Sequence, residues 1–76
     1  MLENSEKLNN QAVHLASKGE YEDAIACLKR AITVENSNYL LWFNLGLTYH
    51  DAGNISLAKA AMEHAYRINP YDEDTL

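Results

Sequence analysis

Cysteine, proline and glycine are scarce in this 76-residue chain, and each scarcity excludes a kind of structure. The one cysteine, Cys27, has no second cysteine with which to form an internal disulfide, so the fold is not a disulfide-stapled one. The one proline lies at position 70 and the three glycines at positions 19, 46 and 53, which leaves long stretches free of helix breakers. Alternating β-branched residues are also missing, which argues against strands.

Long apolar runs and basic residues are lacking as well. No run approaches the roughly 18 to 20 apolar residues that cross a bilayer, and the polar residues 1–10 lack the features of a signal peptide. The chain has 6 basic and 11 acidic residues, a formal net charge of −5, whereas binding to nucleic acid or anionic lipid requires a basic surface. We therefore expect a cytoplasmic protein that binds neither nucleic acid nor membrane.

Residue types that perform chemistry are present, but they form no recognisable site. His14, His50 and His64 are scattered without the spacing of metal ligands. The sequence has no Cys-x-x-Cys, His-Glu-x-x-His or glycine-rich phosphate motif. Cys27 lies among alanines at helical spacing, so we interpret it as a small packing residue rather than a nucleophile. We predict no catalytic residue, no metal and no cofactor, and hence a protein that is not an enzyme.

What the sequence does contain is helical periodicity, with apolar residues recurring at intervals of three and four. Gly19 and Gly53 suit the left-handed position that ends a helix, and Pro70 stops a helix shortly before it. The pattern and its breakers predict four helices, at residues 4–17, 21–35, 38–52 and 55–68. Because the connections are short, consecutive helices must be antiparallel neighbours. The predicted fold class is all-α, with two tandem helix-turn-helix hairpins.

The chain also repeats itself with a period of 34 residues. A shift by that distance aligns small residue with small residue and large apolar with large apolar, for example Gly19 with Gly53, Ala24 with Ala58, and Leu28 with Met62. We therefore predict two copies of one unit, at residues 5–38 and 39–72. Residues 73–76 are interpreted as a tail or as the start of a truncated third unit.

The second unit carries a recognisable signature of small and large residues. Its members are Trp42-x-x-Leu45-Gly46-x-x-Tyr49, then Ala58-x-x-x-Met62-x-x-Ala65, then Pro70. This pattern resembles the tetratricopeptide repeat, and the first unit resembles it more weakly, with Leu8 in place of the tryptophan and Ala12 in place of the glycine. The resemblance implies a right-handed superhelix of hairpins that binds proteins or peptides. Met62, Tyr66 and Ile68 are expected on a face of the last helix that lacks a cover.

The resemblance also implies which residues line the concave face, since the first helix of each repeat forms it. In the second repeat these positions hold Leu40, Phe43, Leu47, His50 and Asp51, and in the first they hold Glu6, Asn9, Val13, Ala16 and Ser17. Some family members clamp a terminal carboxylate with a lysine and an asparagine in the first repeat. Asn9 and Val13 stand at those two positions here, so the clamp is absent.

Leu40, Phe43 and Leu47 share one side of a helix and are expected to be exposed in a lone monomer. Exposed contiguous apolar groups usually mark an interaction site. The functional hypothesis is a groove that binds a helical or apolar peptide through Leu40, Phe43, Leu47, His50, Val13 and Asn9. The alternative is that the same surface packs against a further repeat, a capping helix or a second copy of the chain. Packing against a second copy would give a homo-oligomer, in which helices could be swapped. The sequence does not decide between them.

Overall fold

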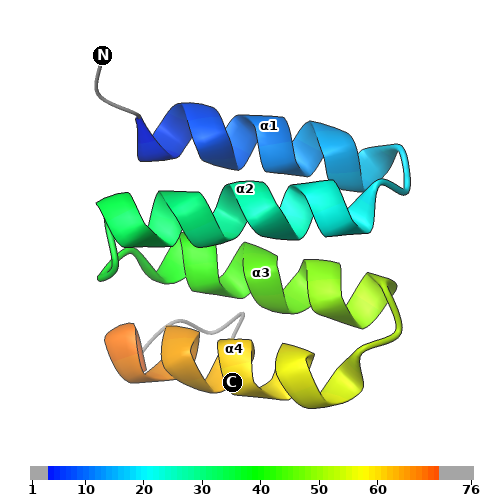
Figure 1. The fold of residues 1–76 in the computed structure, drawn as a ribbon. Coiled ribbons are helices and arrows are strands. Elements are labelled where there is room, and N and C mark those ends of the chain that lie inside the picture. Colours follow the sequence, from blue (N-terminus) through cyan, green and yellow to red (C-terminus); the bar gives the residue numbers. More distant parts are fainter. Residues whose placement is uncertain (1–3, 71–76) are drawn as a thin grey trace.

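Four α-helices follow one another in the computed structural model, which describes residues 4–70 (Figure 1). They are α1 (Ser5–Ser17), α2 (Tyr21–Val34), α3 (Tyr39–Asp51) and α4 (Ile55–Ile68). The helices lie side by side in chain order, and each runs antiparallel to the one before. The predicted all-α fold and its helix boundaries are confirmed, the boundaries to within one residue. The tail expected at residues 73–76 lies outside the described residues.

Asparagine side chains start three of the four helices. The Asn4 carboxamide oxygen accepts the backbone N–H of Glu6 at 2.8 Å, and Asn38 accepts that of Leu40 at 3.1 Å. Asn54 accepts the N–H of Leu57 at 3.3 Å. Each bond satisfies a donor that the first turn of a helix leaves without an intrahelical partner. The residues around positions 4, 38 and 54 therefore fix where α1, α3 and α4 begin.

Glycine shapes the turn inside each hairpin. Gly19 follows α1 with a φ of 80°, and Gly53 follows α3 with a φ of 87°. In both turns the residue after the glycine donates its N–H to a carbonyl five residues earlier, at 2.9 Å in the first turn and 2.8 Å in the second. This is the Schellman arrangement, and it requires a residue that tolerates the left-handed region. The two hairpins therefore share one turn geometry.

The core runs through all four helices and alternates alanines with larger apolar residues. Ala24 and Ala31 of α2 are fully buried, which lets α1 and α3 approach α2 closely. Leu28 and Leu41 are the largest side chains with almost no exposure. Leu41 was not among the residues that the sequence pattern singled out, whereas Trp42, the largest residue of the repeat signature, is only half-buried. Leu45, Gly46 and Tyr49 of the same signature are buried as expected, so the pattern identified most of the inner face of α3. It missed Leu41 because α3 is apolar around most of its circumference.

The two hairpins meet at the α2–α3 connection, where Glu35 holds three segments together. Its carboxylate accepts a hydrogen bond from the Ser5 hydroxyl and another from the Asn38 amide, each at 2.9 Å. These bonds, that of Asn38 more than that of Ser5, hold the pKa of Glu35 below its ordinary value because they stabilise the charged form. The start of α1 is thereby tied to the start of α3.

Candidate protein-binding surface

The first helices of the two hairpins share a surface, which we call the α1–α3 face and which holds the six predicted binding residues. A hydrogen bond joins α1 to α3 on this face: the Asn44 side-chain amide donates to the Asn9 carboxamide oxygen at 2.8 Å. Both residues are partly buried. The bond fixes the distance between the two helices, and Asn44 is a member of the face that sequence reasoning did not select. In the sequence, only its position one turn before Leu47 indicates that Asn44 lies on this face.

Apolar side chains flank this bond along both helices. Val13, one turn after Asn9, is 53% exposed, and Leu47, one turn after Asn44, is 45% exposed. Leu40, one turn before Asn44, is 50% exposed. Leu40 and Leu47 are thus exposed as expected. Phe43 is half-buried rather than exposed, because α3 packs against helices on more than one side and more of its circumference is covered.

Polar groups occupy the end of the face where α3 finishes. The His50 Nδ1 atom lies 3.6 Å from an Asp51 carboxylate oxygen, with both side chains largely exposed. A pair this exposed contributes little to stability. At the opposite end lies a hollow of about 540 Å³ lined by residues from α1, the α2–α3 connection and α3: Asn4, Ser5, Glu6, Asn9, Glu35, Asn38, Leu40 and Leu41. The face therefore runs from this hollow, over exposed leucines and a valine, to a polar end.

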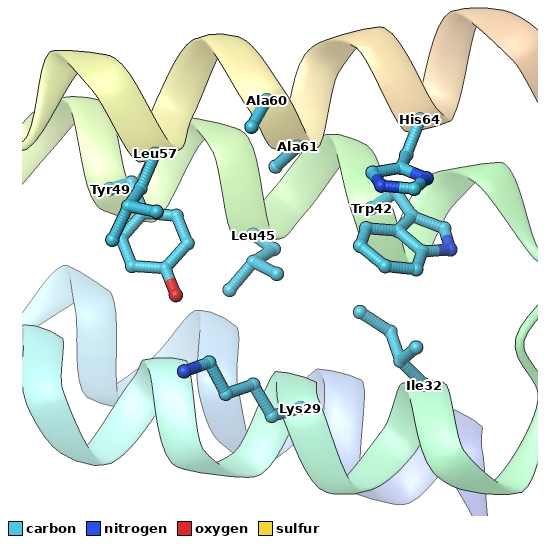
Figure 2. Close-up of a pocket in the computed structure, with 9 residues that line it drawn as sticks. All are labelled: Lys29, Ile32, Trp42, Leu45, Tyr49, Leu57, Ala60, Ala61 and His64. Atoms are coloured by element: carbon cyan, nitrogen blue, oxygen red, sulfur yellow. The ribbon is translucent and has the colours of Figure 1, made fainter.

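A second hollow, of about 260 Å³, lies away from the α1–α3 face (Figure 2). Its lining is mostly apolar and comes from α2, α3 and α4: Lys29, Ile32, Trp42, Leu45, Tyr49, Leu57, Ala60, Ala61 and His64. The Trp42 and His64 rings stack with centroids 4.3 Å apart and planes 19° apart. The Trp42 indole N–H donates to the Asn36 carbonyl at 3.0 Å. We call this feature the Trp42 hollow; sequence reasoning missed it, since the stack joins residues from two helices.

Groups that would hold a metal are not gathered anywhere in residues 4–70: no cluster of three or more His, Cys, Asp or Glu side chains occurs there. Cys27 is half-buried on α2 and packs against the core. Across the same residues, each helix is too short or too polar to cross a membrane. Together, the stacked hairpins and the exposed apolar face define a helical-repeat protein.

Comparison with known proteins gives the family. The family model described as "TPR repeat" matches residues 14–53, and the one described as "Tetratricopeptide repeat" matches residues 39–72. The chain belongs to the tetratricopeptide repeat family. Repeats of this family generally mediate protein–protein interaction and are typically non-enzymatic.

The chain is also similar to part of a longer protein. It is 32% identical over 65 residues to tetratricopeptide repeat protein 16 of Mus musculus, and 31% identical over 65 residues to the protein of that name in Homo sapiens. Each alignment covers 86% of this chain, but only 8% of the mouse protein and 7% of the human one. The likeness therefore concerns the repeat unit and not the whole of either relative.

Proposed function

We propose that this chain binds a helical or apolar peptide segment of a partner protein on the α1–α3 face. The residues we assign to the contact are the six selected from the sequence: Leu40, Phe43, Leu47, His50, Val13 and Asn9. The role is binding without catalysis, and we place it in the cytoplasm. A net charge of −5 favours a protein partner over nucleic acid or an anionic lipid surface.

One observation carries the proposal: Val13 and Leu47 are exposed at equivalent positions of neighbouring repeats, each one turn beyond the residue that its helix contributes to the Asn9–Asn44 bond. Apolar side chains exposed together are typical of interaction sites. Each carboxamide has more donors and acceptors than the single bond between them uses, so the pair is able to bond the backbone of a ligand. Apolar contacts would supply affinity, and the amides would orient the peptide.

Self-assembly through this same face, with or without exchange of helices, is the alternative that the sequence leaves open. It has a different signature, because a homo-oligomer forms at raised protein concentration without any peptide. Leu47→Glu would then lower the molar mass in solution as well as peptide affinity. If the wild type and Leu47→Glu have the same molar mass in solution, the α1–α3 face is not occupied by a second copy and is available to a foreign peptide.

The test is to select binders from a displayed random library of peptides of about 15 residues, in which we expect apolar and helical sequences to be enriched. The selected peptides are then titrated with the protein in solution. We expect Val13→Glu and Leu47→Glu each to weaken binding by about tenfold or more, since a charge would be buried at the contact. Leu57→Glu is the matched control, because Leu57 has the same 45% exposure as Leu47 but lines the Trp42 hollow. If the selected peptides bind Val13→Glu and Leu47→Glu as tightly as the wild type but bind Leu57→Glu more weakly, the binding site is the Trp42 hollow instead.

A further inference from the structure

The outer side of α4 carries an exposed stripe with the spacing of a helix–helix seam. Its members lie at intervals of four, three and four residues, with Glu63 beside them: Ile55, Lys59, Met62, Glu63 and Tyr66. Ile55 is 58% exposed and Tyr66 is 42% exposed, while Met62 is half-buried because its side chain also packs on Gly46 of α3. A shallow hollow of about 330 Å³ follows the same stripe. The apolar members Ile55, Met62 and Tyr66 lie seven and four residues apart, a spacing typical of a surface that packs against another helix. We call it the α4 stripe.

The first hairpin shows what such a stripe does. Residues 34 positions earlier, on α2, include Ile25, Leu28 and Ile32. Leu28 and Ile32 retain only 1% and 9% exposure, and α2 packs against α1 and α3. On α4 the equivalent side has no further helix over it within residues 4–70. Among the described residues, the outer side of α4 is therefore a helix-packing surface that no other helix covers.

The opposite end of the described residues does not complement that surface. On α3, Leu41, Leu45 and Thr48 are buried, and their equivalents on α1 are Lys7, Gln11 and His14, which are all exposed. Head-to-tail stacking of two copies would set these polar side chains on the α4 stripe and bury them without assigned partners. Such a heterologous contact would also give a ring or an open filament rather than a dimer. Of the two outer ends of the described helices, the α4 stripe is therefore a better partner for a second copy's stripe than the polar side of α1 is.

The charges on the stripe suit this self-pairing. Lys59 and Glu63 are opposite in sign and lie one turn apart on the exposed side. When two α4 helices pack antiparallel about a two-fold axis, each Lys59 ammonium comes opposite the other copy's Glu63 carboxylate. The Lys59 stem then covers the other copy's Met62, and Ile55 comes opposite Tyr66.

We propose that the α4 stripe is a self-complementary interface, through which two copies of this chain form a two-fold dimer. The proposal does not depend on the α1–α3 face, which stays open on each copy. One helix per partner buries an area at the low end of interface sizes, so the dimer should be weak and its population should rise with protein concentration. The arrangement would present two peptide-binding faces in one particle.

The test is the molar mass of the whole chain in solution, measured by sedimentation equilibrium from micromolar to millimolar concentration. We expect Tyr66→Glu to weaken the dimer by about tenfold or more. Lys59→Glu and Glu63→Lys should each weaken it by about fivefold, because each sets like charges in apposition twice. The protein that carries both substitutions should regain the dimer dissociation constant of the wild type. An equimolar mixture of the two single variants should dimerise better than either variant alone.

Two controls keep the outcome clear. Circular dichroism confirms that each variant is folded, which is expected because Lys59, Glu63 and Tyr66 are exposed. Leu47→Glu alters an exposed residue of the α1–α3 face and should leave the dimer unchanged. A wild-type monomer at every concentration, a mass that grows beyond two copies, a dimer sensitive to Leu47→Glu, or variants that fail to complement each other in the mixture would each overturn the proposal.

Discussion

The two hairpins have the same helix order and the same turns, yet they fill their interiors differently. Ala12 in the first hairpin is replaced by Gly46 in the second, and Leu28 by Met62. A Cβ added to Gly46 would lie 3.0 Å from three atoms of the Met62 side chain, so the glycine gives up volume that the longer side chain uses. The smaller residue on one helix is therefore matched by a longer side chain on the other, so the space between the two helices of each hairpin is filled by different residue pairs.

Within residues 4–70 the hairpins also differ in which helix is covered by the other hairpin, α2 in the first and α3 in the second, and this difference predicts the largest effect. Leu41 on α3 is 2% exposed, whereas Lys7 at the equivalent position of α1 is exposed. Leu41→Ala should lower the free energy of unfolding by about 2–4 kcal/mol, since it removes packing and leaves a cavity. Lys7→Ala should change it by less than about 0.5 kcal/mol. Urea denaturation followed by circular dichroism compares them, and equal losses would contradict the asymmetry.

The turns, by contrast, should behave alike. Gly19 and Gly53 have φ values of 80° and 87° and no atoms within 4 Å of an added Cβ, so strain arises from the backbone alone. Alanine at either position should lower the free energy of unfolding by about 1–2 kcal/mol. Asparagine, which tolerates this conformation better, should cost less. Thermal unfolding of the four variants gives the comparison, and a large difference between the two turns would show that they are not equivalent.

Exchanging the interior residues tests whether the two packings are interchangeable. Gly46→Ala should lower the free energy of unfolding by about 1 kcal/mol, because the contact with Met62 outweighs the better helix propensity of alanine. Adding Met62→Leu reproduces the first hairpin's pair and should restore at least the wild-type value. Chemical denaturation of the single and double variants provides the measurement. A double variant weaker than Gly46→Ala would mean that other neighbours set the volume at this site.

The smallest effect is expected at the joint between the hairpins, where Glu35 accepts hydrogen bonds from Ser5 and Asn38. Because the folded-state pKa of Glu35 is lowered, its contribution to stability is present above the ordinary glutamate value and is lost as pH falls through the folded pKa. Carboxyl NMR titration should show this pKa rising in Asn38→Ala, and rising less in Ser5→Ala. No rise in either variant would remove these bonds as its cause.

Much of the fold could be predicted because its punctuation is local. Gly19, Gly53 and Pro70 act within one or two residues of their own positions, and the predicted helix boundaries agree with the observed ones to within one residue. The orientation of α3 was harder, since Leu41 and Trp42 are neighbours on a mostly apolar helix, and tertiary packing decides which of them is buried. Leu41 is inside, and Trp42 lies at the edge of the hollow.

The candidate binding site was predicted less completely. The resemblance selected Val13, Leu40 and Leu47, which are exposed, but it did not anticipate the partial burial of Phe43. Nor did it anticipate the Asn9–Asn44 bond, which depends on two side chains meeting across helices 35 positions apart. Periodicity within one helix carries no information about such contacts. That the face binds a peptide stays a prediction.

The order of the helices in space has a consequence for how the chain loses its structure. Each helix packs mainly on its neighbours in sequence, and the two middle helices, α2 and α3, each pack on both sides. Contacts this local favour rapid folding, and in stacked repeats opening proceeds from the ends inward. Amide hydrogens of α1 and α4 should therefore exchange with solvent before those at the α2–α3 contact, which should be the last helix–helix contact to open.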